Sequence, residues 1–220
     1  MPVLVLVATG IPLQFTEQLQ LGRAEVGVNW LQSSYGIVAP ESLLVSAQVS
    51  QIGGVVLIAD RVIDSDYMRA GNLVGSTTHE SATSVAFENA FFLVPHDSTM
   101  PIEVTTPPER ILRFGTVADA LVIDTAQGIY ASNDLGASWQ SSASPLLSQA
   151  SWHSATRKQA DPASRERYRA SRLSWERVLT DMHSGRLFGQ PGEWVMNIAS
   201  MVLILLAMTG LVMWVIPRKR

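Results

Sequence analysis

The side chains that most often carry chemistry in proteins are scattered through this sequence. Its histidines are His79, His96, His153 and His183, and no two of them have the close spacing of paired metal ligands. There is no cysteine, which excludes disulfides, thiolate zinc sites and cysteine nucleophiles. The G-x-S-x-G, P-loop and H-E-x-x-H motifs are also absent. We therefore predict no metal site and no catalytic residue, and favour a non-catalytic protein while leaving enzymatic activity open.

Composition indicates a membrane protein. The 220 residues include 16 Lys and Arg against 19 Asp and Glu, a formal net charge of −3. A protein that binds nucleic acid along its whole length is usually basic, so we expect no nucleic acid among the partners. Only 16% of the residues are charged, below the roughly 25% of soluble domains, and this favours association with a lipid bilayer.

The clearest element is an uncharged run near the C-terminus. Residues 194–216 carry no charge, and as a helix they would be about 35 Å long, enough to cross a bilayer core of about 30 Å. Trp194 and Trp214 lie near the two ends, where indole rings favour the membrane interface. The basic tail, residues 217–220, follows directly and predicts a cytoplasmic C-terminus. The preceding chain would then lie outside the cytoplasm.

The N-terminal segment is apolar but short. Residues 2–15 are too few to span a bilayer, and we expect them to form the outer part of a transmembrane helix that begins upstream. Gly10 and Gly210 occur in similar Thr-Gly contexts of the two apolar segments. A small residue lets another helix approach closely, so these glycines either mark a helix contact or are unrelated.

The middle of the chain predicts a β-rich domain. Short runs of β-branched and aromatic residues between residues 43 and 140 predict six to eight antiparallel strands; the runs are LLVSAQV, VVLIAD, NLVG, AFFLV, RILRFG and ALVIDT. Residues 72–90 are the weakest part of this pattern and are also compatible with a helix. Residues 141–160 are rich in Ser and Ala and are typical of a linker.

A helix is predicted to begin after the linker. Asp161 and Pro162 suit its N-cap and first turn, and the stop is Ser184-Gly185. Residues 157–186 hold eight of the 16 basic residues. The basic face of this helix either contacts anionic lipid head groups or is a solvated face with pairs such as Glu166 and Arg169.

Together these elements predict an α+β membrane protein. A small antiparallel β-rich extracytoplasmic domain precedes a helix and a C-terminal transmembrane helix, with a partial transmembrane helix at the N-terminus. The predicted parts, in order, are a partial helix 1–16, a β-rich domain 17–140, a linker 141–160, a juxtamembrane helix and loop 161–192, a transmembrane helix 193–216 and a cytoplasmic tail 217–220.

One hairpin has a recognisable pattern. Ser132, Asp134, Gly136, Ser138 and Trp139 match S-x-D-x-G-x-S-W at every fixed position. The pattern resembles the Asp-box of sialidase-type β-propellers, where it is a structural turn. Asp134 would accept hydrogen bonds from the turn, Gly136 would supply a positive φ and Trp139 would pack beneath. With one copy, we expect an Asp-box-like hairpin in a partial sheet instead of a full propeller.

The two ends of the chain resemble a second family. Residues 175–179, 181–189, 209–211 and 213–214 read WERVL, DMHSGRLFG, TGL and MW, and residues 9–13 read TGIPL. These segments are similar to the PepSY-associated transmembrane proteins of bacteria. The resemblance implies the bacterial inner membrane, with the main domain in the periplasm.

Three functions are weighed: the lack of a catalytic constellation, the Asp-box-like hairpin and the single full-length span support the favoured one, and the resemblance implies the two alternatives. The favoured one is a non-catalytic accessory subunit whose periplasmic β domain binds or scaffolds a protein partner. The first alternative is an electron-transfer or ferric-siderophore reductase component that binds haem b, for which only His183 is carried over as a ligand. The second alternative is a modulator of an envelope protease. No cofactor is predicted under the favoured function.

Overall fold

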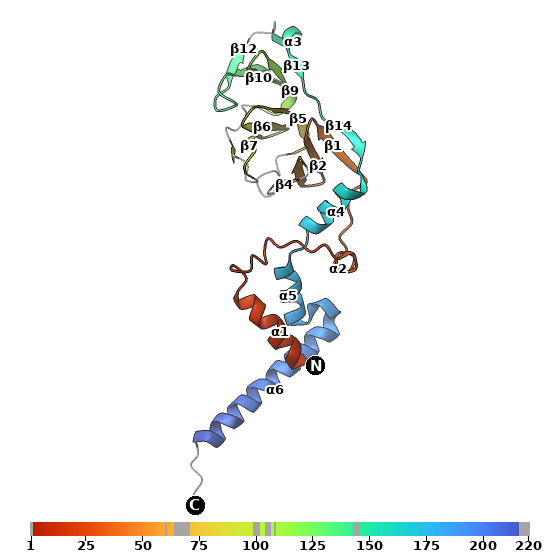
Figure 1. Cartoon of the computed structure of the whole chain (residues 1–220), viewed down its shortest axis with the longest axis vertical. Helices are drawn as coiled ribbons and strands as arrows, with labels where there is room; N and C mark the ends of the chain where they lie inside the picture. The colour runs from red at the N-terminus through yellow and green to blue at the C-terminus, as the bar shows by residue number, and fades with distance from the viewer. Residues whose placement is uncertain are drawn as a thin grey trace, which may run out of the picture. The chain divides into compact units, whose positions relative to one another are not determined.

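The structure, a computed structural model, describes residues 2–59, 61–63, 71–98, 102–103, 107, 109–142 and 146–215. The chain divides into two compact units (Figure 1). The helical unit comprises Met1–Gly36 and Ala170–Arg220, and the β unit comprises Ile37–Arg169. Antiparallel sheets together with an apolar C-terminal helix and a short N-terminal helix confirm the predicted α+β class.

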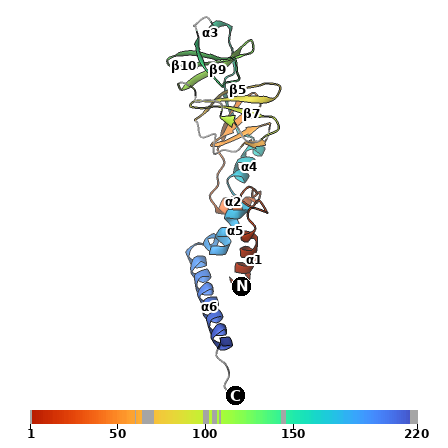
Figure 2. The same ribbon diagram turned by 90° about the vertical axis from the view of Figure 1, so that its left-hand side faces the viewer.

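The described residues of the β unit form three antiparallel sheets (Figure 2). The first sheet has the strand order β14-β1-β2-β3-β4, the second β5-β6-β7-β8 and the third β12-β11-β10-β9-β13. The strands are β1 (Ser42–Ser46), β2 (Val49–Ile52), β3 (Val55–Ile58), β4 (Arg61–Ile63), β5 (Leu73–Thr78), β6 (Ala82–Phe87), β7 (Phe91–Pro95), β8 (Ile102–Glu103), β9 (Ile111–Val117), β10 (Ala120–Thr125), β11 (Gly128–Ser132), β12 (Gln140–Ser142), β13 (Ser151–Trp152) and β14 (Thr156–Gln159). A short helix, α3 (Leu146–Gln149), precedes β13.

Apolar side chains fill the spaces between the sheets. One cluster joins the first and second sheets through residues that include Val56, Ile63, Phe87 and Phe92. Another joins the second and third sheets through Phe91, Phe114, Leu121 and Ile123, among others. The first strands of neighbouring sheets also meet: Ser76 donates its backbone N–H to Ser46 Oγ (2.9 Å) and its hydroxyl to Ser46 O (2.6 Å). Both serines are buried, so these bonds fix the first sheet against the second.

A single extended segment, residues 151–159, runs along the first strands of all three sheets, and we call it the strap. Its β13 pairs with β9 and its β14 pairs with β1, both antiparallel. Between them, the backbone N–H of Ala155 donates to Val74 O of β5 (2.8 Å). An unpaired strand edge can form hydrogen bonds with another chain. The strap forms backbone hydrogen bonds with β9, β5 and β1 from within the same chain, and we call the edges formed by these three strands the inner edges of the sheets.

Two glycines make room for the strap. A Cβ atom at Gly75 of β5 would overlap the backbone carbonyl of His153, and one at Gly115 of β9 would lie 2.6 Å from the carbonyl oxygen of Ser151. Backbone carbonyls held in a sheet cannot turn aside as a flexible side chain would. The close crossing therefore requires glycine on both strands.

The predicted linker 141–160 is therefore wrong. This segment contains the end of β12, the helix α3 and the strands β13 and β14, and its strands pair within the first and third sheets. The side chains of β14, Thr156–Gln159, are all exposed. The strand is held by backbone pairing, so its sequence carries no alternation of apolar residues that would have predicted it.

The β region also differs from expectation in its number of strands. Between residues 42 and 142 the described chain forms β1 to β12, where six to eight strands were predicted. The run LLVSAQV contains a turn at Ala47, which has φ +48°, and alanine is not a typical residue for such turns. Residues 72–90 form β5 and β6, so the alternative of a helix there is wrong. The single partial sheet is likewise corrected to three sheets.

The predicted long helix is two helices. The first, α4 (Pro162–Ser171), begins where expected, because Asp161 Oδ1 accepts from the Ser164 N–H (2.9 Å). The second, α5 (Trp175–Ser184), has a new N-cap at Ser174 and ends at Gly185 as predicted, with φ +81°. Between them, Leu173 is buried and its carbonyl accepts from the Val26 N–H (2.9 Å). Because the carbonyl of Leu173 is bonded to Val26, the backbone is not helical between the end of α4 and the start of α5.

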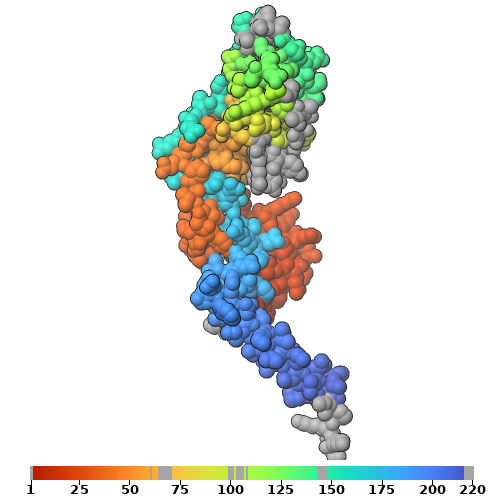
Figure 3. Space-filling view, turned by 180° about the vertical axis from the view of Figure 1, so that it is seen from behind, coloured from red at the N-terminus to blue at the C-terminus, as the bar shows by residue number. Residues whose placement is uncertain are grey.

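The helical unit further contains α1 (Pro2–Gln14), α2 (Asn29–Ser34), the 3₁₀ helix η2 (Arg186–Phe188) and α6 (Gly189–Val215). Among the described residues, one helical segment, Arg186–Val215, is long and apolar enough to cross a membrane. Its apolar side chains are largely uncovered, and Figure 3 shows α6 in dark blue as a single projecting rod. The predicted cytoplasmic tail, residues 217–220, lies outside the described residues.

Replacing Gly75 with alanine tests the crossing of the strap. The new methyl group meets the backbone of His153, so we expect a loss of about 2 kcal/mol or more in the free energy of unfolding of the β unit. Denaturant unfolding of the detergent-solubilised chain, followed by tryptophan fluorescence, measures this loss. Gly27→Ala is the matched control, because nothing lies within 4 Å of its new Cβ atom. If Gly75→Ala and Gly27→Ala unfolded at the same denaturant concentration, the close contact between β5 and the strap would be contradicted.

Candidate functional site

His183 lies in the helical unit, where α5 meets α1. The Thr9 hydroxyl donates to the Val5 carbonyl (2.6 Å), and Thr9 Oγ1 lies 2.9 Å from His183 Nδ1. The single hydroxyl proton is used by Val5, so Thr9 Oγ1 must accept a hydrogen bond from His183 Nδ1–H. In the neutral ring, Nε2 of His183 then carries the lone pair. Thr9 is only 3% exposed, so the hydrogen bond is shielded from water.

Small residues position His183. The ring lies against Gly10 of α1, where an added Cβ would come within 3.4 Å of His183 Cε1. Gly185 follows in the left-handed conformation, and the carbonyl of Gly192 lies too close to it for a Cβ atom. The chain therefore turns sharply from the end of α5 into η2 and α6.

The structure does not bring Gly10 and Gly210 together. The neighbour of Gly10 is the His183 ring, and no atom of the described residues lies within 4 Å of a Cβ built at Gly210. Of the two interpretations of these glycines, the contact between them is wrong. The sequence resemblance had identified His183, but its partner on α1 was not foreseen.

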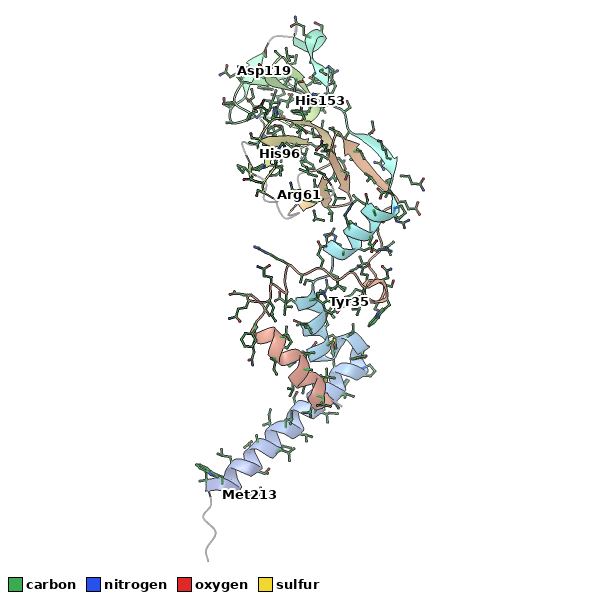
Figure 4. The ribbon with its side chains drawn as sticks, in the orientation of Figure 1. Tyr35, Arg61, His96, Asp119, His153 and Met213 are labelled. Atoms are coloured by element: carbon green, nitrogen blue, oxygen red, sulfur yellow. The ribbon has the colours of Figure 1, made fainter. Side chains whose placement is uncertain are left out.

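A second polar cluster in the helical unit was missed by the sequence analysis. Tyr35 donates its hydroxyl to Asp181 Oδ2 (2.9 Å), and Arg177 Nε lies 4.0 Å from the same oxygen. The Arg177 guanidinium also lies over the Tyr35 ring, 5.3 Å from its centroid. Burial, followed by the hydrogen bond to Asp181, raises the pKa of Tyr35 to about 12. The phenol therefore stays protonated and links the segment after α2 to α5 (Figure 4).

An apolar cavity of about 370 Å³ lies between α1, α5 and α6. Its walls include Val5, Met182, Phe188 and Met196, and His183 is not among the residues that line it. The cavity belongs to the part of the helical unit where the membrane-spanning segment begins.

The five matching residues of the predicted Asp-box-like hairpin come together in the turn between β11 and β12. Asp134 accepts from the hydroxyl of Ser132 (2.7 Å), and from the N–H (2.9 Å) and hydroxyl (2.6 Å) of Ser138. Gly136 has φ +94° and lies against the Phe91 ring. Trp139 packs edge-on against the same ring, with centroids 5.3 Å apart. The turn thus anchors the third sheet to the second.

Hydrogen bonds from Ser132 and then Ser138 lower the pKa of Asp134 to about 2. The ordinary value is 3.8, so the carboxylate stabilises the folded turn fully above that pH. This contribution is lost as the pH falls from about 4 towards 2.

The remaining histidines are separate from one another. His79 and His153 each bond a hydroxyl group at 3.1 Å, from Ser84 and Thr116 respectively, and His96 lies 3.4 Å from Thr83 Oγ1. Figure 4 labels His96 and His153. Within the described residues, no group of three or more His, Asp or Glu side chains is placed to hold a metal ion.

Comparison with known protein families identifies the class of this chain. The family model described as the PepSY-associated TM region matches residues 1–216. The chain therefore belongs to the PepSY-associated transmembrane family and is a membrane protein, as the motifs at its two ends predicted. No curated protein and no solved structure matches the chain.

Replacing Asp134 with asparagine tests the turn. We expect a lower unfolding midpoint at neutral pH and a weaker dependence of that midpoint on pH between about 4 and 2, because the carboxylate that titrates there is gone. Thermal unfolding monitored by tryptophan fluorescence measures both. Asp119→Asn, in the exposed turn between β9 and β10, is the control. If the midpoint of Asp134→Asn fell between pH 4 and pH 2 as much as that of the parent protein, this carboxylate would not support the turn.

Proposed function

We propose that this protein is a non-catalytic subunit anchored in the bacterial inner membrane, whose β unit lies in the periplasm and holds a protein partner. The observation that carries the proposal is the contrast between the two edges of the sheets. The strap covers the inner strands β1, β5 and β9. At the other ends of the sheets, the described strands β4, β8 and β12 each pair with one neighbour, as the strap strands β13 and β14 also do.

These outer strands suit a protein partner. A one-sided strand offers backbone N–H and C=O groups to an added strand, a common mode of recognition between proteins. Ile102 of β8 is 53% exposed, and Gln140 of β12 is also exposed. Because β1, β5 and β9 already have the strap beside them, we expect an added strand to pair with β4, β8 or β12. The rigid β unit would present these edges while α6 holds the complex at the bilayer.

The periplasmic orientation rests on charge. The basic tail, residues 217–220, follows α6 directly, and positive residues beside a span favour the cytoplasmic side. Residues 157–186 are also basic, but long extracytoplasmic domains cross the membrane largely regardless of their charge.

Single cysteines test both the partner and the orientation, because the chain has no native cysteine. We expect Ile102→Cys or Gln140→Cys to cross-link to a stoichiometric partner in native membranes, and both to react with an impermeant maleimide in spheroplasts. The products are resolved by native mass measurement and mass spectrometry.

Arg157→Cys on the exposed strand β14 of the strap is the matched control for these cross-links. It should react with the maleimide but give no partner cross-link. A monomeric mass without cross-links from either outer strand would overturn the partner, and labelling only after membrane disruption would overturn the orientation.

The geometry of His183 favours haem binding as a second candidate function. A metal-bound histidine commonly donates its other ring N–H to a hydrogen-bond acceptor, and His183 Nδ1–H does so towards Thr9. His183 thus fits the role of one ligand, through Nε2. Haem iron bound there would supply one-electron transfer. The protein's contribution is to hold the ring and its tautomer by the contact between α1 and α5.

A reduced-minus-oxidised spectrum of the purified protein tests this candidate. We expect a haem signal that His183→Ala abolishes, and that Thr9→Val weakens by about 10-fold or more in haem affinity, since Thr9 orients the ring. His79→Ala, in the β unit, is the control and should leave the signal intact. Absence of the signal, or its persistence in His183→Ala, would exclude this ligand.

A further inference from the structure

The segment formed by β14 and α4 is strongly basic in an otherwise acidic chain. Within residues 156–172, two acidic side chains, Asp161 and Glu166, stand against the basic residues Arg157, Lys158, Arg165, Arg167, Arg169 and Arg172. The whole chain has a net charge of −3. Positive charge is therefore concentrated at the C-terminal end of the β unit, where five of these six basic residues lie.

The fold brings Lys158 and the helix α4, which carries Arg165 and Arg169, to one side of the first sheet. Tyr168 of α4 packs with Leu43 on the outer face of that sheet. Lys158 lies directly opposite Leu43 in the β1–β14 pair, and directly paired residues share a face. Arg165 and Arg169 lie one turn apart on α4. We call Lys158, Arg165 and Arg169 the α4 basic surface.

The charges of this surface are not neutralised within the described chain. The Nε atoms of Arg165 and Arg169 are shielded from solvent and have no hydrogen-bond acceptor among the described residues. The Glu166–Arg169 ion pair suggested by their spacing is not formed there. Buried donors are nearly always satisfied, so two neighbouring Nε–H groups without an acceptor among the described residues are unusual, and they favour an anion at these two arginines.

We infer that the α4 basic surface binds the phosphate groups of anionic lipids in the bilayer that α6 enters. Arginine forks match phosphate oxygens in geometry and charge. The source of the phosphate follows from connectivity, because Gly189, the first residue of α6, comes only 20 residues after Arg169. A basic surface tethered so close to a membrane meets lipid phosphate at high local concentration. Its role would be to hold the β unit against the bilayer.

The experiment uses the full chain in lipid nanodiscs. Ala163→Cys places a donor dye on the exposed first turn of α4 in a chain without other cysteines, and rhodamine-labelled lipid head groups act as acceptors. We expect energy transfer to be greater in discs of phosphatidylcholine with phosphatidylglycerol than in phosphatidylcholine alone. Added salt should reduce the difference, because screening weakens attraction between exposed charges.

Paired variants assign the effect to the α4 basic surface. Each basic side chain near an anionic membrane contributes about 1 kcal/mol, so Arg165→Gln with Arg169→Gln should weaken docking about 30-fold. Arg110→Gln with Arg157→Gln removes the same charge elsewhere: Arg110 lies just before β9, and Arg157 is on the opposite face of the first sheet. This control should dock as the parent does.

Three results would overturn the inference. The first is equal energy transfer in the two lipid compositions. The second is equal loss in the two paired variants, which would indicate an effect of net charge alone. The third is loss of docking in anionic discs on addition of millimolar inorganic phosphate at constant ionic strength, which would assign the site to free phosphate.

Discussion

The β unit depends on the hydrogen bonds that the strap makes to the inner strands of three sheets. Each sheet forms from neighbouring segments, but the first strands lie at its inner edge. Residues 151–159 supply partners to β9, β5 and β1 in turn. Gly75 and Gly115 permit the approach because their neighbours are backbone carbonyls of the strap. One short segment thus joins the three sheets through backbone hydrogen bonds.

The helical unit is organised by polar contacts between segments distant in the sequence. Thr9 and His183 join α1 to α5, and Tyr35 and Asp181 join the segment after α2 to the same helix. The Val26–Leu173 backbone bond ends the helical path between α4 and α5. The last turn of α5 therefore gathers the groups with distinctive chemistry close to the start of the membrane-spanning helix.

The sequence predicted the features that depend on local composition. The uncharged run gave α6, Asp161 and Gly185 marked helix ends, and the motifs at both ends of the chain identified the family. The strap escaped prediction because its strand β14 is exposed and held by backbone pairing, which leaves no apolar periodicity. The turn at Ala47 escaped for a related reason, since its positive φ is imposed by the neighbouring strands instead of the residue type.

Contacts between distant side chains were harder to predict than helices and strands. His183 was identified by resemblance, yet Thr9 lies 174 positions away and no local pattern links the two residues. The resemblance between the Thr-Gly pairs suggested instead a contact of Gly10 with Gly210, which the structure does not contain. Spacing predicts neighbours along one helix, whereas contacts between segments depend on the completed fold.

Hydrogen exchange of the full chain in detergent tests the central claim most directly. If the strap closes the three sheets, the amides of Ala155 and His153, which donate to Val74 and Phe114, should exchange as slowly as those of β1, β5 and β9. Exchange of residues 151–159 at the rate of an unstructured linker, with the sheets still protected, would contradict this account of the fold.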